Sequence, residues 1–193
     1  MINIGLIGES PYDTKAIKHL LQKRYDVGYR YTTLLKNVTG DHLNTLKAIR
    51  AIASEVKQKN PDVVVVMRDA DAYESDINRI KEKQDWYIHL SGQISNKSLF
   101  LLNIFELEAL LFADIDTLNA HYGTSFSNRN VMYIDRPKEE LKRKTKGSRK
   151  YAESHCPVLF KLMRIEIVSK NCTYFRDFLG EFTKLIGENK KTA

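Results

Sequence analysis

An apolar run in the middle of the chain, Val63 to Met67, leads directly into Arg68 and then two aspartates. The run is β-branched and too short for a helix that stands alone, and Asn60-Pro61 precedes it as a breaker. We therefore predict a strand buried on both faces, as found in the middle of a parallel sheet. Asp69 and Asp71 then lie at its carboxyl end, the edge at which open α/β sheets bind ligands.

The chain ahead of this strand alternates apolar runs with amphipathic stretches. Residues 2–8 and 27–35 have the apolar content of strands, while residues 14–25 repeat their apolar side chains with a helical period. A stronger helical stripe runs from residue 43 to residue 56. This β–α–β–α–β order predicts an α/β fold, with a mostly parallel sheet and helices on both of its faces.

The pattern beyond Asp71 is less regular, but it still divides into elements. These are a short polar helix (72–83), a strand (86–90), an apolar run (99–104) leading into a helix that Gly123 ends (105–122), an edge strand (131–134), two amphipathic helices (158–168 and 175–186) and a solvated tail (188–193). We expect a single domain overall, in which residues 1–125 form a catalytic core. Residues 126–193 would add a basic stretch and a helical C-terminal extension packed on that core.

Composition places the chain among ordinary globular proteins. It has 193 residues, of which 42% are hydrophobic and 28% charged, and no apolar run approaches the ~20 residues of a membrane span. The first residues are strand-like and lack a basic leader, so we expect no signal peptide and a cytoplasmic location. In that compartment Cys156 and Cys172 are expected to be reduced thiols.

The chain is basic, with a formal net charge of +7 and an isoelectric point of about 9.3, which permits a polyanionic partner such as nucleic acid. Much of the positive charge is concentrated in one stretch that begins at Lys138. The candidate nucleic-acid-binding residues in it are Lys142, Arg143, Lys144, Lys146, Arg149 and Lys150. A merely solvated helix face is the alternative. Tyr133 and Tyr151 flank the stretch, and aromatic side chains beside basic ones suit single strands or loops.

Acidic residues gather where apolar runs give way to the next element. They are Glu9 and Asp13, Asp69 and Asp71, and Glu106 and Glu108. Because strand-to-helix junctions share one edge of a parallel sheet, these carboxylates would repel one another unless cations neutralise them. Two Mg²⁺ or Mn²⁺ ions ~4 Å apart would do so, and they would position a water and a phosphodiester for in-line displacement.

Not every one of these carboxylates needs a metal. An aspartate after a strand is often a helix cap or a turn former, and capping alone accounts for Asp13. Glu106 and Glu108 are two residues apart, so on an α-helix they cannot both face one point, and Glu106 is the stronger candidate. The candidate catalytic residues are therefore Glu9, Asp69, Asp71 and Glu106, and the wider set of candidate metal ligands adds Asp13 and Glu108.

Phosphoryl transfer also benefits from a cation that stabilises the developing charge. Arg68 adjoins Asp69, but in an extended strand its side chain alternates to the opposite side, which favours a structural role. Lys97, Lys146 and Arg149 are the other candidates for this catalytic cation.

The arrangement resembles the Toprim fold, the catalytic domain of topoisomerases, primases and OLD-type nucleases, which has a Glu after its first strand and an Asp-x-Asp after a later one. Glu9 matches the first motif and Asp69-Ala70-Asp71 the second. A group of small stand-alone Toprim-like proteins is more similar still. Glu106 to Asp114 matches its Glu-x-Glu-Ala segment, and Cys172 to Phe175 matches its Cys-x-x-Phe element, so the resemblance covers nearly the whole chain. Glu9-Ser10-Pro11 departs from the Glu-Gly often found in the first motif.

The resemblance implies a Toprim-like Rossmannoid fold and a nuclease that depends on Mg²⁺ or Mn²⁺, with two ions. It is similar to the toxic effectors of OLD- and PARIS-type anti-phage systems, in which a separate ABC-type ATPase controls the nuclease. The chain contains no Gly-x-x-x-x-Gly-Lys-Ser/Thr sequence of its own, so such an ATPase would be a partner protein. A homodimer is a further expectation.

Two other functions are compatible with the same residues. Asp-x-Asp also holds nucleotide-sugar diphosphates through Mg²⁺ in transferases, although Glu9 and the order of elements fit that class less well. A regulatory subunit of an ATPase complex, with a silent site, is the non-enzymatic alternative. The sequence leaves open whether the substrate of a nuclease would be DNA or RNA.

Overall fold

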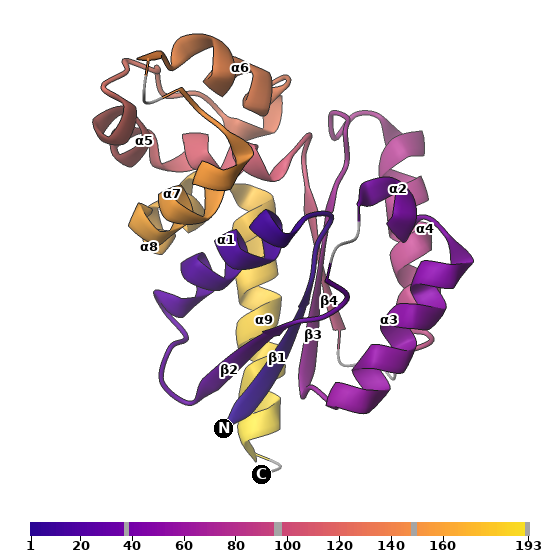
Figure 1. Ribbon diagram of the computed structural model, residues 1–193. Helices are drawn as coiled ribbons and strands as arrows, with labels where there is room; N and C mark the ends of the chain where they lie inside the picture. Colours follow the sequence, from indigo (N-terminus) through magenta and orange to yellow (C-terminus); the bar gives the residue numbers. More distant parts are fainter. Residues whose placement is uncertain (37–38, 95–97, 148–149, 192–193) are drawn as a thin grey trace.

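A parallel β-sheet forms the centre of the protein (Figure 1). The computed structural model describes residues 1–36, 39–94, 98–147 and 150–191, with side chains as far as residue 187. Within these residues the sheet has four strands in the order β2-β1-β3-β4, all parallel. The strands are β1 (Ile2–Ile7), β2 (Tyr29–Thr33), β3 (Val63–Asp69) and β4 (Ser98–Asn103).

Helices cover both faces of this sheet. In chain order the helical elements are α1 (Pro11–Gln22), α2 (Gly40–Leu43), α3 (Leu46–Lys59), α4 (Ile77–Ser91), the 3₁₀ helix η1 (Leu107–Asp114), α5 (Ile115–Tyr122), the 3₁₀ turn η2 (Val131–Tyr133), α6 (Pro137–Lys144), the 3₁₀ turn η4 (Glu153–His155), α7 (Cys156–Leu162), α8 (Ile165–Asn171) and α9 (Thr173–Lys191). In Figure 1, α1 and α9 lie on one side of the sheet, and α2, α3 and α4 lie on the other. The predicted α/β class, with helices on both faces and a helical C-terminal segment, is confirmed.

The central strand β3 is buried on both faces because a separate core packs against each. Val65 belongs to the larger core, with α1, α7, α8 and α9, and Val66 belongs to the smaller core, with α2, α3 and α4. This explains why its sequence is continuously apolar rather than alternating. On β1, a Cβ at Gly5 would lie 2.6 Å from Leu34 Cδ1, so the close packing of the chain there requires glycine.

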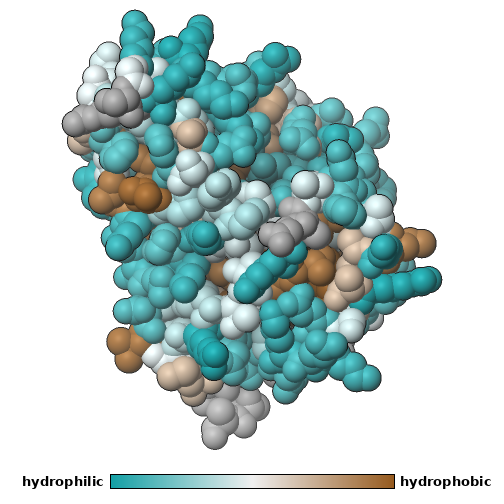
Figure 2. Space-filling model, in the orientation of Figure 1, coloured by the Kyte–Doolittle hydropathy of each residue, from teal (hydrophilic) through white to brown (hydrophobic). Residues whose placement is uncertain are grey.

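The surface is mostly hydrophilic on the face shown in Figure 2, with small apolar patches between polar ones. None of the described helices is both long and apolar enough to cross a bilayer.

Two predicted strands are wrong, because a short apolar run does not reveal its period. The predicted strand 86–90 is the C-terminal part of α4, whose N-terminus is capped by Asp76 rather than near residue 72. Its side chains follow a helical spacing, so that Leu90 is buried while Ile88 is exposed. The predicted edge strand 131–134 is the 3₁₀ turn η2, with Val131 buried and Tyr133 exposed.

Several helix boundaries also differ from the predictions. Helix α1 begins at Pro11 because Ser10 caps it, three residues earlier than predicted. The predicted helix 158–168 is two helices, α7 and α8, which meet where Arg164 turns to bind Asp114. The predicted tail (188–193) is helical as far as Lys191, where α9 ends, and residues 192–193 lie outside the described residues. By contrast, α5 ends at Gly123 as predicted, in a left-handed conformation with φ of 64°.

Candidate functional site

A pocket of about 280 Å³ lies at the carboxyl ends of β1 and β3. Its lining residues are Glu9, Ser10, Tyr12, Asp13, Thr39, Gly40, Asp69, Glu108, Lys138, Glu153 and Cys156. Larger hollows of about 510 and 900 Å³ lie at the amino-terminal edge of the sheet, and each is lined by a single carboxylate, Asp26 or Asp62. Of these three hollows among the described residues, the smallest is the one in which carboxylates crowd together. We therefore take it as the candidate active site and call it the carboxylate pocket.

Asp69, the last residue of β3, is fixed by the neighbouring strand. It pairs in register with Asn103 of β4, and its Oδ1 accepts hydrogen bonds from Asn103 Nδ2 and from the Leu107 N–H, each at 3.0 Å. Burial raises the pKa of Asp69 well above its ordinary value, and the nearby Asp13 and Glu9 carboxylates raise it further. A cation at this position would relieve that repulsion.

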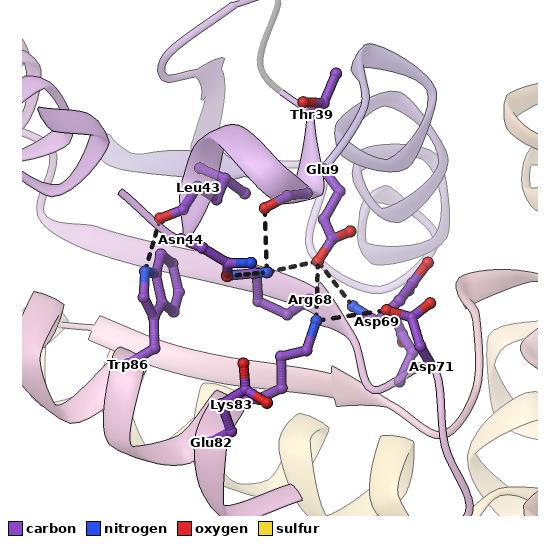
Figure 3. Close-up of polar contacts among 12 residues, drawn as sticks. Glu9, Thr39, Leu43, Asn44, Arg68, Asp69, Asp71, Glu82, Lys83 and Trp86 are labelled. Carbon is purple, nitrogen blue, oxygen red and sulfur yellow. Dashed lines mark hydrogen bonds and ion pairs between the residues drawn. The ribbon is translucent and has the colours of Figure 1, made fainter. Parts of the chain in front are cut away.

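Glu9 follows β1 and turns toward β3 (Figure 3). Its Oε1 accepts hydrogen bonds from Arg68 Nε and, at 3.3 Å, from the Asp69 N–H, and Lys83 Nζ lies 4.0 Å away. Gly40 packs directly against this carboxylate, because a Cβ at Gly40 would lie 2.3 Å from Glu9 Oε2. The first turn of α2 therefore leaves room for Glu9 only because it begins with glycine.

Arg68 points to the opposite face of β3 from Asp69, as strand alternation predicts, and still reaches Glu9. Its guanidinium is fully buried, 4.5 Å from the centre of the Trp86 ring, and Nη2 donates to Asn44 Oδ1 at 2.9 Å. Arg68 Nη1 is buried with no hydrogen-bond partner among the described residues. The arginine thus lies behind the carboxylate pocket and is not part of its lining.

Asp71 is placed apart from Asp69, although only one residue separates them. It has a left-handed backbone with φ of 54°, its side chain is half exposed, and its Oδ2 lies 3.5 Å from Lys83 Nζ on α4. Asp71 therefore faces α4 and solvent, as Figure 3 shows, and does not line the carboxylate pocket.

Asp13 has two roles in the structure. It forms a capping box with Ser10, accepting from the Ser10 N–H at 2.8 Å and from Ser10 Oγ at 2.7 Å, and it also lines the pocket. Burial raises its pKa, and the Glu9 carboxylate contributes to that increase, although the Ser10 hydrogen bonds oppose it. The capping interpretation and the site interpretation are both compatible with this placement.

Glu106 and Glu108 both approach one point because the chain there is not an α-helix. Glu106 has an extended backbone at the start of the 3₁₀ helix η1, and Glu108 is in its first turn. Glu108 is buried in the pocket and accepts a hydrogen bond from the Tyr151 hydroxyl at 2.8 Å, whereas Glu106 lies at the margin. The spacing argument that favoured Glu106 assumed an α-helix, and it does not hold for this geometry.

Lys138 is the cation of this site. Its Nζ lies 3.6 Å from Glu106, 4.0 Å from Glu108 and 3.4 Å from Glu153, and its backbone N–H donates to Glu106 Oε2 at 3.1 Å. Although burial lowers the pKa of Lys138, the surrounding carboxylates raise it well above its ordinary value, so the ammonium stays charged. Burial raises the pKa of Glu108, an effect that Lys138 and Tyr151 partly offset.

Sequence reasoning did not assign a site role to Lys138, Glu153, Asn103 or Tyr151. Lys138 and Glu153 come from the part of the chain assigned to a basic surface and helical extension, more than thirty residues beyond Glu106. The sequence contains one indication of where Lys138 lies. It directly follows Pro137, a residue typical of the first helical position, and α6 begins there. Nothing in the sequence alone connects that helix start to Glu106.

The carboxylate oxygens have the chemistry that Mg²⁺ and Mn²⁺ prefer, but they are turned toward protein donors. Glu9 accepts from Arg68, Asp69 from Asn103, and Glu108 from Tyr151. Accordingly, no group of three or more His, Cys, Asp or Glu side chains within the described ranges is arranged to hold a metal ion. The carboxylate oxygens are therefore the type of ligand that a hard cation binds. To bind one, Glu9 would have to replace its ion pair with Arg68 by a bond to the cation.

The basic stretch is partly neutralised by its own helix. Lys142 pairs with Glu139 at 3.0 Å, and Lys144 pairs with Glu140 at 3.2 Å, while the Arg143 and Lys146 side chains are exposed. Of the flanking aromatic residues, Tyr133 is exposed, but Tyr151 is buried beside the carboxylate pocket, which corrects its predicted place on the surface. Lys150 is also exposed. Arg149 and Lys97 lie outside the described residues.

Comparison with known proteins adds no family to this description. No family model, no curated protein and no solved structure matches the chain, so its function has to be argued from the carboxylate pocket itself.

Proposed function

We propose that this protein is a metal-dependent nuclease that hydrolyses phosphodiester bonds of nucleic acid in the carboxylate pocket. The observation that supports this most strongly is the crowding of Glu9, Asp13, Asp69 and Glu108 around one pocket at the carboxyl edge of a parallel sheet. Mutual repulsion and burial raise the pKa of Asp13 and of Asp69 there. Such repulsion destabilises the folded protein when the carboxylate pocket is empty and favours the binding of a cation there.

Glu9, Asp69 and Glu108 would hold Mg²⁺ or Mn²⁺, with Asp13 behind them. Bound there, a divalent ion would polarise a phosphodiester and favour ionisation of a water. Glu9 would accept the proton of the attacking water, because it is the carboxylate at the mouth between β1 and α2. Asp71 and Glu106 would act at the margin, since neither lines the pocket.

Lys138 would stabilise the developing negative charge on the phosphate. Its ammonium already lies among carboxylates at the pocket, and its backbone is fixed by Glu106. A fixed cation directed at charge that develops in the transition state is worth a factor of about 10²–10³ in rate in other enzymes. Lys138 therefore replaces Arg68, Lys97, Lys146 and Arg149 as our candidate for the catalytic cation.

The control of such a nuclease by a separate ATPase, as in anti-phage systems, rests on the Toprim resemblance of the sequence. One structural observation favours a regulated site. Glu9 is bound to Arg68, so the pocket is in a resting arrangement in which a candidate ligand faces a protein cation. A partner that moved β3 or α2 relative to Glu9 would release this carboxylate. The second candidate function is therefore a subunit whose site stays silent until such a partner binds.

The test is cleavage of labelled single- and double-stranded DNA and RNA with Mg²⁺ or Mn²⁺, by the wild-type chain and by Asp69→Asn and Glu9→Gln. We expect both substitutions to abolish cleavage while circular dichroism shows a folded chain. Glu9→Gln should also lower the melting temperature, because the buried Arg68 loses its charged partner. The matched control is Asp26→Asn, which removes a carboxylate from the hollow at the opposite edge of the sheet. Cleavage that survives both substitutions in the pocket would refute the proposal.

The two alternatives give different results in the same experiment. A silent subunit would show no cleavage alone, but would bind Mn²⁺ in a manner that depends on Asp69. A nucleotide-sugar transferase would be protected from thermal unfolding by a nucleotide-sugar diphosphate with Mn²⁺, and it would leave all labelled nucleic acids intact.

A further inference from the structure

A second hollow, of about 710 Å³, exposes aromatic side chains. It is lined by Tyr73, Glu74, Ser75, Ile77, Met132 and Tyr133. Tyr133 is 76% exposed, Ile77 74% and Tyr73 41%, so large apolar surfaces face solvent on both walls. We call this hollow the tyrosine groove. Exposed apolar surface gathered in one concave place is typical of a binding site.

The walls of the tyrosine groove are fixed by local hydrogen bonds and ring packing. The Tyr73 ring packs edge-on against Phe105, with ring centres 4.4 Å apart. The Phe105 N–H donates to Ala72 O at 3.1 Å, and the Asp71 N–H donates to Phe105 O at 3.0 Å. On the other wall, Asn130 Oδ1 accepts from the Met132 N–H at 3.0 Å and caps the turn η2. The Tyr73 ring and the backbone that carries Tyr133 are therefore held in place before any ligand binds.

The residues of the tyrosine groove lie close in the sequence to residues of the candidate active site and its margin. Tyr73 follows Asp71 by two residues, and Tyr133 precedes Lys138 by five. Asp71 and Lys138 both lie at the carboxyl edge of the sheet, one beside α4 and the other in the carboxylate pocket. Segments that begin at the carboxyl edge of the sheet thus carry both walls of the tyrosine groove, within reach of a chain-like ligand.

The groove itself and the chain that follows it differ in charge. The only charged residue in its lining is Glu74, so the groove suits uncharged rings that can donate hydrogen bonds, rather than phosphates. Positive charge follows Tyr133 in the sequence, at Arg136, whose side chain is 78% exposed and lies 3.9 Å from Asp135, and further along at Arg143 and Lys146. Uncharged rings linked by a negatively charged backbone are the chemistry of a nucleic acid strand.

We propose that the tyrosine groove binds unpaired nucleobases, stacked on Tyr73 and Tyr133, and that it selects single-stranded over double-stranded nucleic acid. This inference rests on the proposed nuclease function and specifies its substrate class. Bases in a duplex are stacked on one another and do not offer their faces to a protein, whereas every unpaired base has a face on which tyrosine can stack. The backbone phosphates pass toward Arg136 and the basic surface of α6.

The test measures binding without cleavage, in EDTA. Fluorescence anisotropy of labelled strands of ~12 nucleotides, a length within the usual site size, compares single-stranded DNA, single-stranded RNA and a blunt DNA duplex. Tyr133→Ala and Tyr73→Ala are each expected to weaken single-strand binding about tenfold or more, because one base stack is worth about 1–3 kcal/mol. Tyr133→Phe should retain most of the affinity, since it keeps the ring. Ile88→Ala is the control, an exposed apolar residue at the other end of α4.

The outcomes separate this inference from the proposed function. The groove assignment would be overturned if neither tyrosine substitution changed the affinity for single strands. It would also be overturned if both substitutions weakened duplex binding as much as single-strand binding. Either result would leave the nuclease proposal standing. A dimer in size-exclusion chromatography that Tyr133→Ala converts to a monomer would assign the groove to a second copy of the chain and overturn it too. Tyrosine-dependent strand binding in a chain that cleaves nothing would instead support the groove and refute the nuclease. A comparison of the DNA and RNA arms identifies the sugar preference.

Discussion

Arg68 and Glu9 form an ion pair that links the buried face of the sheet to the carboxylate pocket. Arg68 lies in β3, Glu9 lies two residues beyond the end of the adjacent strand β1, and the arginine is fully buried between Glu9 and the Trp86 ring. A cation that binds Oε1 of Glu9 would therefore compete with Arg68. The ion pair connects the stability of the fold to the availability of the candidate ligand.

Replacement of Arg68 is expected to destabilise the fold strongly. Arg68→Met removes the partner of Glu9 and of Asn44 Oδ1, and breaking a buried ion pair typically lowers the free energy of unfolding by about 3–5 kcal/mol. Urea denaturation measures this change. Arg79→Met is the matched control, because Arg79 forms an exposed pair with Glu82 at 3.0 Å, which is worth about 1 kcal/mol at most. Equal losses for the two variants would contradict the prediction.

Asp69 and Asp114 are expected to respond to pH in opposite directions. Burial raises the pKa of Asp69, and Asp13 and Glu9 add to that effect; burial also raises the pKa of Asp114, but hydrogen bonds from Arg164 outweigh it and lower the value. Folded Asp69 holds its proton more tightly than unfolded Asp69, so its contribution to stability is present at low pH and is lost as the pH rises through the raised pKa. The contribution of Asp114 is present above its unfolded pKa and is lost as the pH falls.

Two asparagine variants test this difference. With EDTA present, Asp69→Asn should increase the free energy of unfolding at neutral pH and flatten its decline between acid and neutral pH, since the amide keeps an acceptor for the Leu107 N–H. Asp114→Asn should decrease the free energy of unfolding at neutral pH, because Arg164 loses its charged partner. Urea titrations over a pH series give both quantities. A neutral-pH loss of stability in Asp69→Asn as large as that in Asp114→Asn would show that repulsion at Asp69 is unimportant.

A divalent cation should stabilise the fold through the same carboxylates. At a concentration of ~100 times its dissociation constant, Mn²⁺ or Mg²⁺ is expected to raise the free energy of unfolding by about 2.7 kcal/mol, which differential scanning calorimetry detects as a higher melting temperature. Asp69→Asn should lose most of this shift. Sodium chloride of matched ionic strength is the control, because salt alone also screens repulsion between charges. An undiminished shift in Asp69→Asn would place the ion elsewhere.

Gly40 is expected to matter for activity more than for stability. In Gly40→Ala the new methyl group would approach Glu9 Oε2 within 2.3 Å, so the Glu9 side chain must move, and we expect cleavage to fall by about tenfold or more, as for small misplacements of reacting groups. Gly180→Ala is the control: it lies in α9 with nothing within 4 Å, and it should raise stability by about 0.5–1 kcal/mol without a change in cleavage. Similar cleavage by Gly40→Ala and the wild-type chain would argue against a role for Glu9.

The parts of the fold that the sequence predicted are those in which one physical signal dominates. The continuous apolar run of β3 is found as predicted. The helical stripe predicted from residue 43 to residue 56 is found only in part, because Leu43 ends α2 and α3 begins at Leu46, which is exposed. The region from 86 to 90 mixes aromatic and β-branched residues, so its composition favours a strand, while its burial on one helical face against α2 and β4 decides the outcome. Tertiary packing outweighed local preference there.

Of the site residues, only those that follow or end a strand were predictable from the sequence. Glu9 and Asp69 follow directly from the rule that carboxyl ends of parallel strands share an edge, and the structure brings these two together with Glu108. Asp71 departs because the chain turns left-handed immediately after β3. Lys138 was not predictable, since its place depends on how α6 returns to the sheet edge, a long-range contact that neither spacing nor periodicity encodes.

The carboxylate pocket is assembled from residues spread along the chain, from Glu9 after β1 to Cys156 at the start of α7, because α7 packs against α1. During synthesis on the ribosome, Glu9, Asp13 and Asp69 emerge long before Lys138, although Arg68, the partner of Glu9, emerges with them. The nascent N-terminal part therefore lacks the Lys138 ammonium, and the pocket is complete only after α6 and α7 have folded onto it. A chain terminated before residue 138 would have the predicted acidic motifs and still lack a complete carboxylate pocket.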